Sequence, residues 1–243
     1  MKKNSVYWIK LDSIGIGMGD YYFISHAGFI LGEVKMNPIK NKAITIIGCG
    51  TLGSSLAYML ALKNLNLNFL DELNLVDNDV LTSKNYPYIL GYENLHEYEG
   101  LSKPLALSII IEPLFESIEI GCHTDARYIV NLDNTTVIDC RDTANSDIKS
   151  DIKLNIDGEF GYVNFNPGIK KIKEHGSKYT YGNMRFYSML FSGFVVDLLL
   201  KEELRNKYSD EIVISFKDGM EGIYGISRQD FVTTRGGKKY KNK

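Results

Sequence analysis

Three closely spaced glycines follow the first strongly apolar stretch of the chain and form a candidate phosphate-binding loop. The stretch reads ITIIGCGTLGSSLAYMLALKNL over residues 44–65, and Gly48, Gly50 and Gly53 have the spacing G-x-G-x-x-G. In this motif the first glycine makes the strand-to-helix turn, the second admits a phosphate, and the third lets helix and strand pack closely. Because free N–H groups at the helix start bind anions, we expect a nucleotide here.

An acidic residue closes the next predicted strand. Asp77 ends the segment ELNLVD, a position from which a carboxylate accepts hydrogen bonds from ribose hydroxyls. Together the two features favour an adenosine-type nucleotide over a bare phosphate. The alternative is that the glycines serve only close packing and that Asp77 only caps a strand. At this point a nicotinamide-dependent oxidoreductase and an ATP-using enzyme both fit the pattern.

The elements that would position these residues alternate between strand and helix periodicity. Near-continuous apolar strands alternating with helices are typical of a parallel sheet covered by helices, so we expect an α/β, Rossmann-like, doubly wound and mostly parallel sheet. Further strands after residue 150 predict an added antiparallel portion. The expected strands are 43–48, 72–77, 117–121, 135–140, two within 151–167, and two formed by EIVISF and GIYGISRQDF; the expected helices are 51–65, 102–115, a short piece near 125–131, and 183–205.

The chain of 243 residues can bury one substantial core. Short aromatic runs separated by glycines predict a small β extension over residues 1–40. Residues 41–235 are expected to form the nucleotide-binding domain, and residues 236–243 a basic tail.

Composition argues against several classes of protein. The 28 basic and 30 acidic residues give a net charge of -2, which provides no general attraction to nucleic acid or to an anionic membrane. The three cysteines are dispersed and form no C-x-x-C pair, so we expect neither a disulfide framework nor zinc, and we expect a cytoplasmic location. The most apolar window, 186–200, is shorter than the roughly 20 residues that span a bilayer and contains Asp197.

The segments after the second strand resemble the ThiF/MoeB superfamily, which contains adenylating enzymes related to ubiquitin-activating enzymes. Several family motifs occur in the family's order: a D-x-D at a strand end, an Asn in the following loop, a G-x-x-K-x-x-A segment that opens a helix, and a D-C-x-D strand end. The matching residues are Asp77 and Asp79, Asn85, Gly100 with Lys103 and Ala106, and Asp139 with Asp142.

The resemblance implies that ATP and Mg²⁺ bind, and that a carboxylate becomes an acyl-adenylate with release of pyrophosphate. The carboxylate would be the C-terminal glycine of a ubiquitin-like protein or a peptide, and the enzyme a homodimer. Lys103 is a point charge suited to phosphates, Asn85 an uncharged hydrogen-bonding group, and Asp142 a carboxylate suited to Mg²⁺. Lys103 and Asp142 are the expected catalytic residues, and Gly48, Gly50, Gly53, Asp77, Asp79, Asn85 and Lys103 the expected nucleotide-binding residues.

Each role has a structural alternative. Lys103 would instead be a solvated lysine in the first turn of a helix, Asp139 a strand-end cap, and Asn85 a residue that only shapes a turn before YPY.

The sequence also departs from the family pattern. Tyr88 replaces the family's phosphate-binding arginine, and no arginine precedes residue 127. Lys40, Lys42 or Lys84 are candidates to substitute, although a lysine lacks the bidentate fork of arginine. The zinc cysteines are absent, and residues 168–182 contain no acceptor cysteine. These losses leave open a catalytically degenerate nucleotide-binding or partner-binding subunit; an NAD-dependent oxidoreductase is the third hypothesis.

Overall fold

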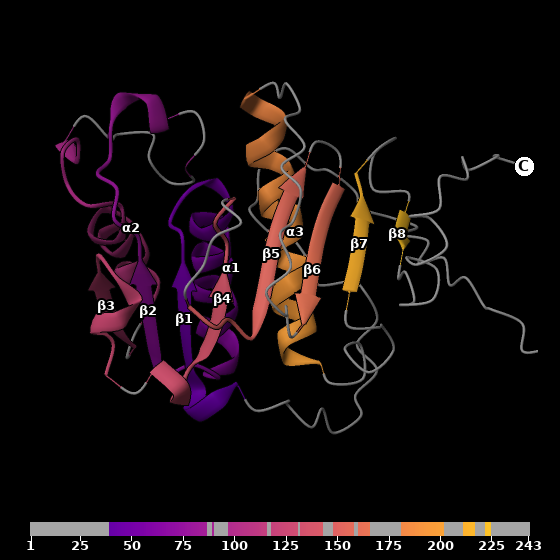
Figure 1. Cartoon of the computed structure of the whole chain (residues 1–243), viewed down its shortest axis with the longest axis horizontal. Coiled ribbons are helices and arrows are strands. Elements are labelled where there is room, and N and C mark those ends of the chain that lie inside the picture. Colours follow the sequence, from indigo (N-terminus) through magenta and orange to yellow (C-terminus); the bar gives the residue numbers. More distant parts are fainter. Residues whose placement is uncertain are drawn as a thin grey trace, which may run out of the picture.

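The computed structural model describes residues 39–86, 89, 97–115, 118–130, 132–142, 148–157, 160–165, 181–201, 211–216 and 222–224 (Figure 1). The predicted β extension lies outside the described residues except for its last two positions, and the predicted basic tail lies outside them altogether.

The described strands form one eight-stranded sheet in the order β3-β2-β1-β4-β5-β6-β7-β8 (Figure 1). Neighbouring strands from β3 to β5 pair in parallel, and those from β5 to β8 pair antiparallel. This arrangement confirms the predicted Rossmann-like, mostly parallel sheet with an added antiparallel portion. The strands are β1 Ala43–Ile47, β2 Glu72–Val76, β3 Glu119–His123, β4 Thr136–Asp139, β5 Ile152–Asp157, β6 Phe160–Phe165, β7 Glu211–Ser215 and β8 Gly222–Tyr224.

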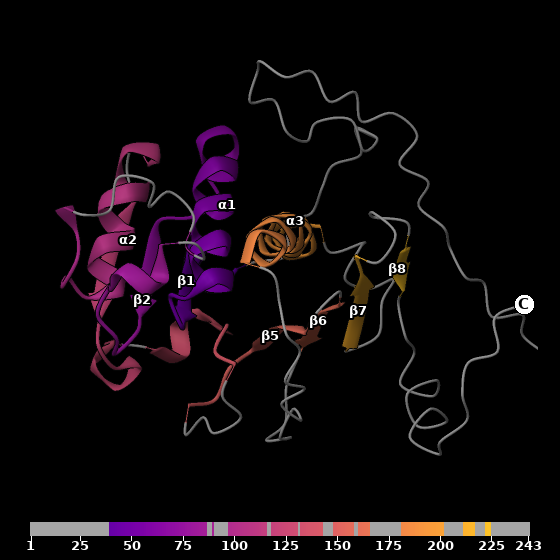
Figure 2. The same ribbon diagram turned by 90° about the horizontal axis from the view of Figure 1, so that it is seen from above.

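The three described α-helices lie side by side on one face of the sheet (Figure 2). They are α1 Thr51–Leu67, α2 Lys103–Ile111 and α3 Tyr181–Leu200. Asn68 ends α1 in the left-handed conformation, and the Asn64 side chain accepts hydrogen bonds from the next two backbone N–H groups. Pro113 prevents α2 from continuing, because proline cannot donate to the helix ladder, and a 3-10 turn follows at Glu112–Leu114.

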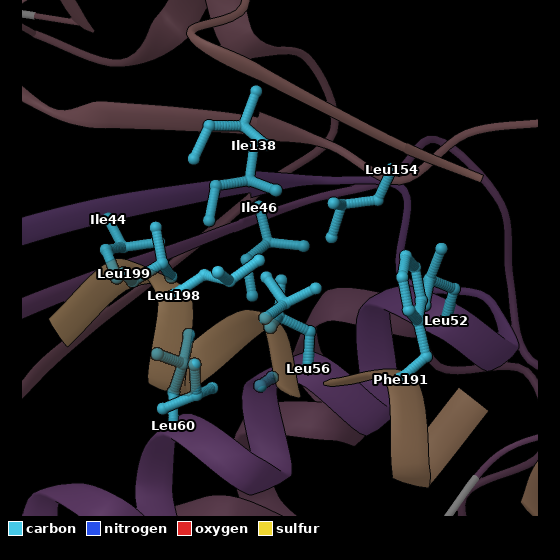
Figure 3. Close-up of a cluster of buried hydrophobic side chains, with 14 of the residues drawn as sticks. Ile44, Ile46, Leu52, Leu56, Leu60, Ile138, Leu154, Phe191, Leu198 and Leu199 are labelled. Carbon is cyan, nitrogen blue, oxygen red and sulfur yellow. The ribbon is translucent and has the colours of Figure 1, made fainter. Parts of the chain in front are cut away.

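The main hydrophobic core lies between the sheet and the helices. Side chains of β1, β4 and β5 pack against α1 and α3; Figure 3 labels Ile44, Ile46, Leu52, Leu56, Leu60, Ile138, Leu154, Phe191, Leu198 and Leu199. On the opposite face, Ile47, Val76 and Val137 pack against the segment around the 3-10 turn Ala126–Tyr128. The strands are therefore apolar on both faces, as parallel strands require. Among the described residues, no helix has the length and apolar character needed to cross a membrane.

Two buried serines on α3 have no hydrogen-bond partner for their hydroxyls among the described residues. Ser188 and Ser192 are both fully buried one turn apart, and neither hydroxyl is paired within the described part of the chain. A buried unsatisfied hydroxyl costs about 1–3 kcal/mol, and alanine is the better helix former. We expect Ser192→Ala to raise the free energy of unfolding by about 1 kcal/mol in urea titrations. The control is Ser108→Ala, because Ser108 is only half-buried and its hydroxyl donates to the Leu105 carbonyl. An equal change in both variants would contradict the prediction.

Candidate active site

The predicted site residues follow the carboxyl ends of three neighbouring strands: the glycine loop follows β1, Asp77 and Asp79 follow β2, and Asp142 follows β4. β1 lies between β2 and β4, so the chain leaves β1 toward one side of the sheet and later returns on the other. Ligands of open α/β sheets bind outside the carboxyl ends of the strands at such a switch point. The glycine loop occupies this position, between the end of β1 and the start of α1.

The three glycines have different surroundings. Gly48 has a φ of 94°, and a Cβ there would lie 2.8 Å from Arg141 Cγ. A Cβ at Gly53 would lie 1.8 Å from the Gly48 carbonyl oxygen, so only glycine lets α1 pack this closely on the loop. A Cβ at Gly50 would meet no atom of the described residues within 4 Å. Neighbouring atoms therefore pack tightly against Gly48 and Gly53, whereas the backbone at Gly50 is accessible.

Asp77 ties the glycine loop to the end of β2. Its Oδ2 accepts a hydrogen bond from Cys49 N at 2.7 Å, and its Oδ1 accepts one from Asp79 N at 2.9 Å. The carboxylate thus holds the backbone of the loop. Each carboxylate oxygen has the capacity to accept a second hydrogen bond, so Asp77 can still bind a ribose hydroxyl, and that contact remains a prediction.

Lys103 approaches the same loop from the start of α2. Its Nζ lies 2.6 Å from Asp79 Oδ2, and its side chain is only 10% exposed, whereas that of Asp79 is 63% exposed. Burial raises the pKa of the Cys49 thiol, and the Asp77 carboxylate raises it further, while the Lys103 ammonium opposes both. The ammonium therefore acts electrostatically on the glycine loop, and Lys103 is not a solvated surface lysine.

Asn85 shapes a turn. Its Oδ1 accepts hydrogen bonds from Thr82 N at 2.9 Å and Thr82 Oγ1 at 3.0 Å, which caps the 3-10 turn Ser83–Asn85. The amide oxygen of Asn85 therefore has the turn-shaping role that the sequence offered as the alternative to nucleotide binding. Contact between Asn85 and a nucleotide remains a prediction.

Asp142 is exposed and follows β4 by three residues. The described residues contain no group of three or more His, Cys, Asp or Glu side chains that could hold a metal ion. Mg²⁺ in nucleotide sites takes one or two carboxylates and the rest of its ligands from phosphates and water. A single carboxylate at Asp142 fits such an ion.

The sequence did not predict an ionic cluster beside the loop. Asp139 Oδ1 accepts a hydrogen bond from Arg141 Nε at 3.0 Å, and Asp139 Oδ2 lies 3.0 Å from Lys153 Nζ. Burial alone would raise the pKa of Asp139, but hydrogen bonds from Arg141 and the charges of Lys153 and Arg141 hold that pKa below its usual value. Asp139 is thus the anion of an ion-pair network. Arg141 was visible in the motif DCRDT, but only the pairing of β4 with β5 reveals Lys153.

No family model matches the sequence, and no curated protein matches it. Several solved structures are similar. The structure of PaaA has a TM-score of 0.50 and 17% identity over 78% of this chain and 65% of that chain. E. coli MccB with MccA has a TM-score of 0.52 and 14% identity over 79% of this chain and 65% of that chain. The chain has a ThiF/MoeB-like fold.

E. coli TcdA aligns over 44% of each chain with a TM-score of 0.36 and 21% identity. The chain spans less than two thirds of the length of these three proteins.

In this ThiF/MoeB-like fold, two of the lysines predicted as possible replacements for the phosphate-binding arginine lie at the amino edge of the sheet, opposite the glycine loop. Lys40 and Lys42 precede β1 and pair with Asp151 and Asp71. The five residues of β1 separate them from the glycine loop by about 16 Å. They cannot serve the loop of their own chain, whereas Lys84 is exposed on the turn that Asn85 caps.

The thiols near the loop are poor nucleophiles. Burial raises the pKa of both Cys49 and Cys140, so each thiol stays protonated at neutral pH. Neither cysteine is therefore suited to carry an acyl group, in agreement with the absence of an acceptor cysteine from residues 168–182.

Proposed function

We propose that this chain binds ATP at the glycine loop and activates a carboxylate as an acyl-adenylate, with release of pyrophosphate. The observation that carries the proposal is that the described residues bring three features to the carboxyl ends of neighbouring strands. The accessible backbone of Gly50 follows β1, Asp79 with its buried partner Lys103 follows β2, and the exposed Asp142 follows β4. The similar fold of E. coli MccB, solved with AMPCPP and MccA together, adds support.

The reaction requires positioning and charge more than a covalent nucleophile. The N–H groups at the start of α1 and the Lys103 ammonium would hold the phosphates, and Asp77 would accept hydrogen bonds from the ribose. One carboxylate oxygen of the substrate attacks the α-phosphorus. The bond from that phosphorus to the oxygen bridging to the β-phosphorus breaks, and pyrophosphate leaves with the electron pair. A Mg²⁺ ion held by Asp142 and the phosphates would offset their negative charge.

The carboxylate is proposed to be the C-terminal glycine of a ubiquitin-like protein or a peptide. An unbranched glycine carboxylate can approach the α-phosphorus with little steric hindrance. A homodimer is the proposed form, as the family resemblance implies, and the cytoplasm is the proposed location.

The test is ATP–pyrophosphate exchange with a pool of peptides that end in Gly-Gly. The same peptides with a C-terminal amide are the matched negative control, because they lack the attacking carboxylate. Lys103→Ala is expected to lower exchange about 100-fold, since removing one preorganised charge contact costs roughly that factor. Lys42→Ala removes a lysine that also pairs with an aspartate, at the opposite edge, and should leave exchange unchanged.

Three results would contradict parts of the proposal. Undiminished exchange in Lys103→Ala would remove that residue from the site. Equal exchange with free and amidated peptides would exclude a C-terminal carboxylate as substrate. Tight binding of ATP without exchange would favour the catalytically degenerate binding subunit.

A further inference from the structure

The glycine loop requires more positive charge than Lys103 supplies. A nucleoside triphosphate carries several negative charges, and the Lys103 ammonium is already paired with Asp79. No arginine precedes residue 127, so an arginine that serves the loop must come from later in the chain. We infer that Arg141 binds the phosphates of the nucleotide and that Asp139 and Lys153 position it. This inference rests on the proposed function.

The stem of Arg141 lies directly over the first glycine of the loop. A Cβ on Gly48 would come within 2.8 Å of Arg141 Cγ and within 3.1 Å of Arg141 N. The backbone of the loop and the arginine are therefore in contact, and glycine at position 48 makes that contact possible. Arg141 thus packs directly against the predicted phosphate loop, although the two are separated by more than 90 residues in sequence.

Asp139 fixes the direction of the guanidinium. Arg141 Nε donates to Asp139 Oδ1 at 3.0 Å, and Arg141 Nη2 donates to Asp139 Oδ2 at 3.1 Å. This fork uses two of the five N–H donors of the guanidinium, and the arginine side chain is 27% exposed. The remaining donors can bind an anion with little loss of side-chain entropy, because the rotamer is already fixed.

Lys153 gives the cluster its net positive charge. Its Nζ lies 3.0 Å from Asp139 Oδ2 and donates to the Arg141 carbonyl at 2.6 Å. One carboxylate is thus shared by two cations. Because the side chains of Asp139 and Lys153 are only 2% and 11% exposed, water screens the excess charge weakly, and an anion beside Arg141 is favoured.

The chain contains a matched control for this arrangement. Arg127 donates through its backbone N and its guanidinium to Asp125, two residues before it, as Arg141 does to Asp139. The Arg127 side chain, however, is 82% exposed and follows β3. Arg127→Gln therefore makes the same chemical change in the same local motif without altering the contact with Gly48.

Calorimetric titration of the whole chain with Mg-ATP and with adenosine separates phosphate binding from nucleoside binding. We expect Arg141→Gln to lower the affinity for ATP about 10- to 100-fold and to leave the affinity for adenosine unchanged. Arg141→Lys keeps the charge but loses the fork to Asp139, and should lower the affinity for ATP about tenfold. Arg127→Gln should bind both ligands as the unsubstituted chain does.

The outcomes distinguish this inference from the proposed function. An unsubstituted chain that does not bind ATP would overturn the proposed function and this inference together. If that chain binds ATP and a folded Arg141→Gln binds it equally well, only the inference is overturned, even if pyrophosphate exchange falls. Equal losses for ATP and adenosine would mean that Arg141 acts only on the structure of the loop. Should Arg141→Gln fail to fold, an unchanged affinity for ATP in Arg141→Lys would overturn the inference.

Discussion

Replacing Gly53 with alanine is expected to lower the free energy of unfolding by about 3 kcal/mol or more, at the upper end of the usual cost of overpacking. The added Cβ would lie 1.8 Å from the Gly48 carbonyl oxygen and 2.9 Å from the Gly48 carbonyl carbon. These are backbone atoms that cannot rotate aside, so α1 would have to move away from the core that it forms with β1 and α3. Urea denaturation followed by circular dichroism measures the loss.

Gly50→Ala is the control for that variant. Gly50 has a φ of -76° and a ψ of -157°, which alanine adopts without strain, and its Cβ would meet no atom of the described residues within 4 Å. We expect its stability to change by less than about 1 kcal/mol. Since the Cβ would occupy the space proposed for a phosphate, the affinity for ATP should nevertheless fall. Equal stability losses in Gly50→Ala and Gly53→Ala would contradict the packing role of the third glycine.

Replacing Asp139 with asparagine is expected to cost about 3 kcal/mol of stability at neutral pH, because it leaves two cations without their buried anion. Arg141 and Lys153 both depend on this carboxylate, which is only 2% exposed. Asp125→Asn is the control. It removes the carboxylate of the same D-x-R motif beside an arginine that is 82% exposed, and should cost much less. Denaturation of the two variants at pH 7 compares them directly.

The contribution of Asp139 is also expected to depend on pH. Its pKa is lower in the folded chain than in the unfolded chain, so its stabilising effect is complete above the unfolded value of about 3.9 and is lost as pH falls through the folded value. The difference in unfolding free energy between the unsubstituted chain and Asp139→Asn should therefore be constant near neutrality and shrink below about pH 4. A difference that stays constant or grows on acidification would contradict this prediction.

The sequence determined the order of elements and the position of the glycine loop. Local signals were sufficient for this purpose. Near-continuous apolar runs predicted β1 and β2, helical periodicity predicted α1, and the spacing of Gly48, Gly50 and Gly53 placed the turn between strand and helix. The boundaries differed by a few residues where capping decides them. The predicted helix 51–65 continues to Leu67. It ends there because Asn68 adopts the left-handed conformation and the Asn64 side chain accepts hydrogen bonds from the backbone that follows.

The tertiary structure decided which charges accompany the loop. Lys153 follows Asp139 by 14 residues, and only the parallel pairing of β4 with β5 makes them direct neighbours. Arg141 is beside Gly48 because β4 pairs with β1, although α1, β2, α2 and β3 intervene in the chain. Residue types and local spacing reveal what a side chain can do, but the register between strands far apart in sequence determines which side chains act together.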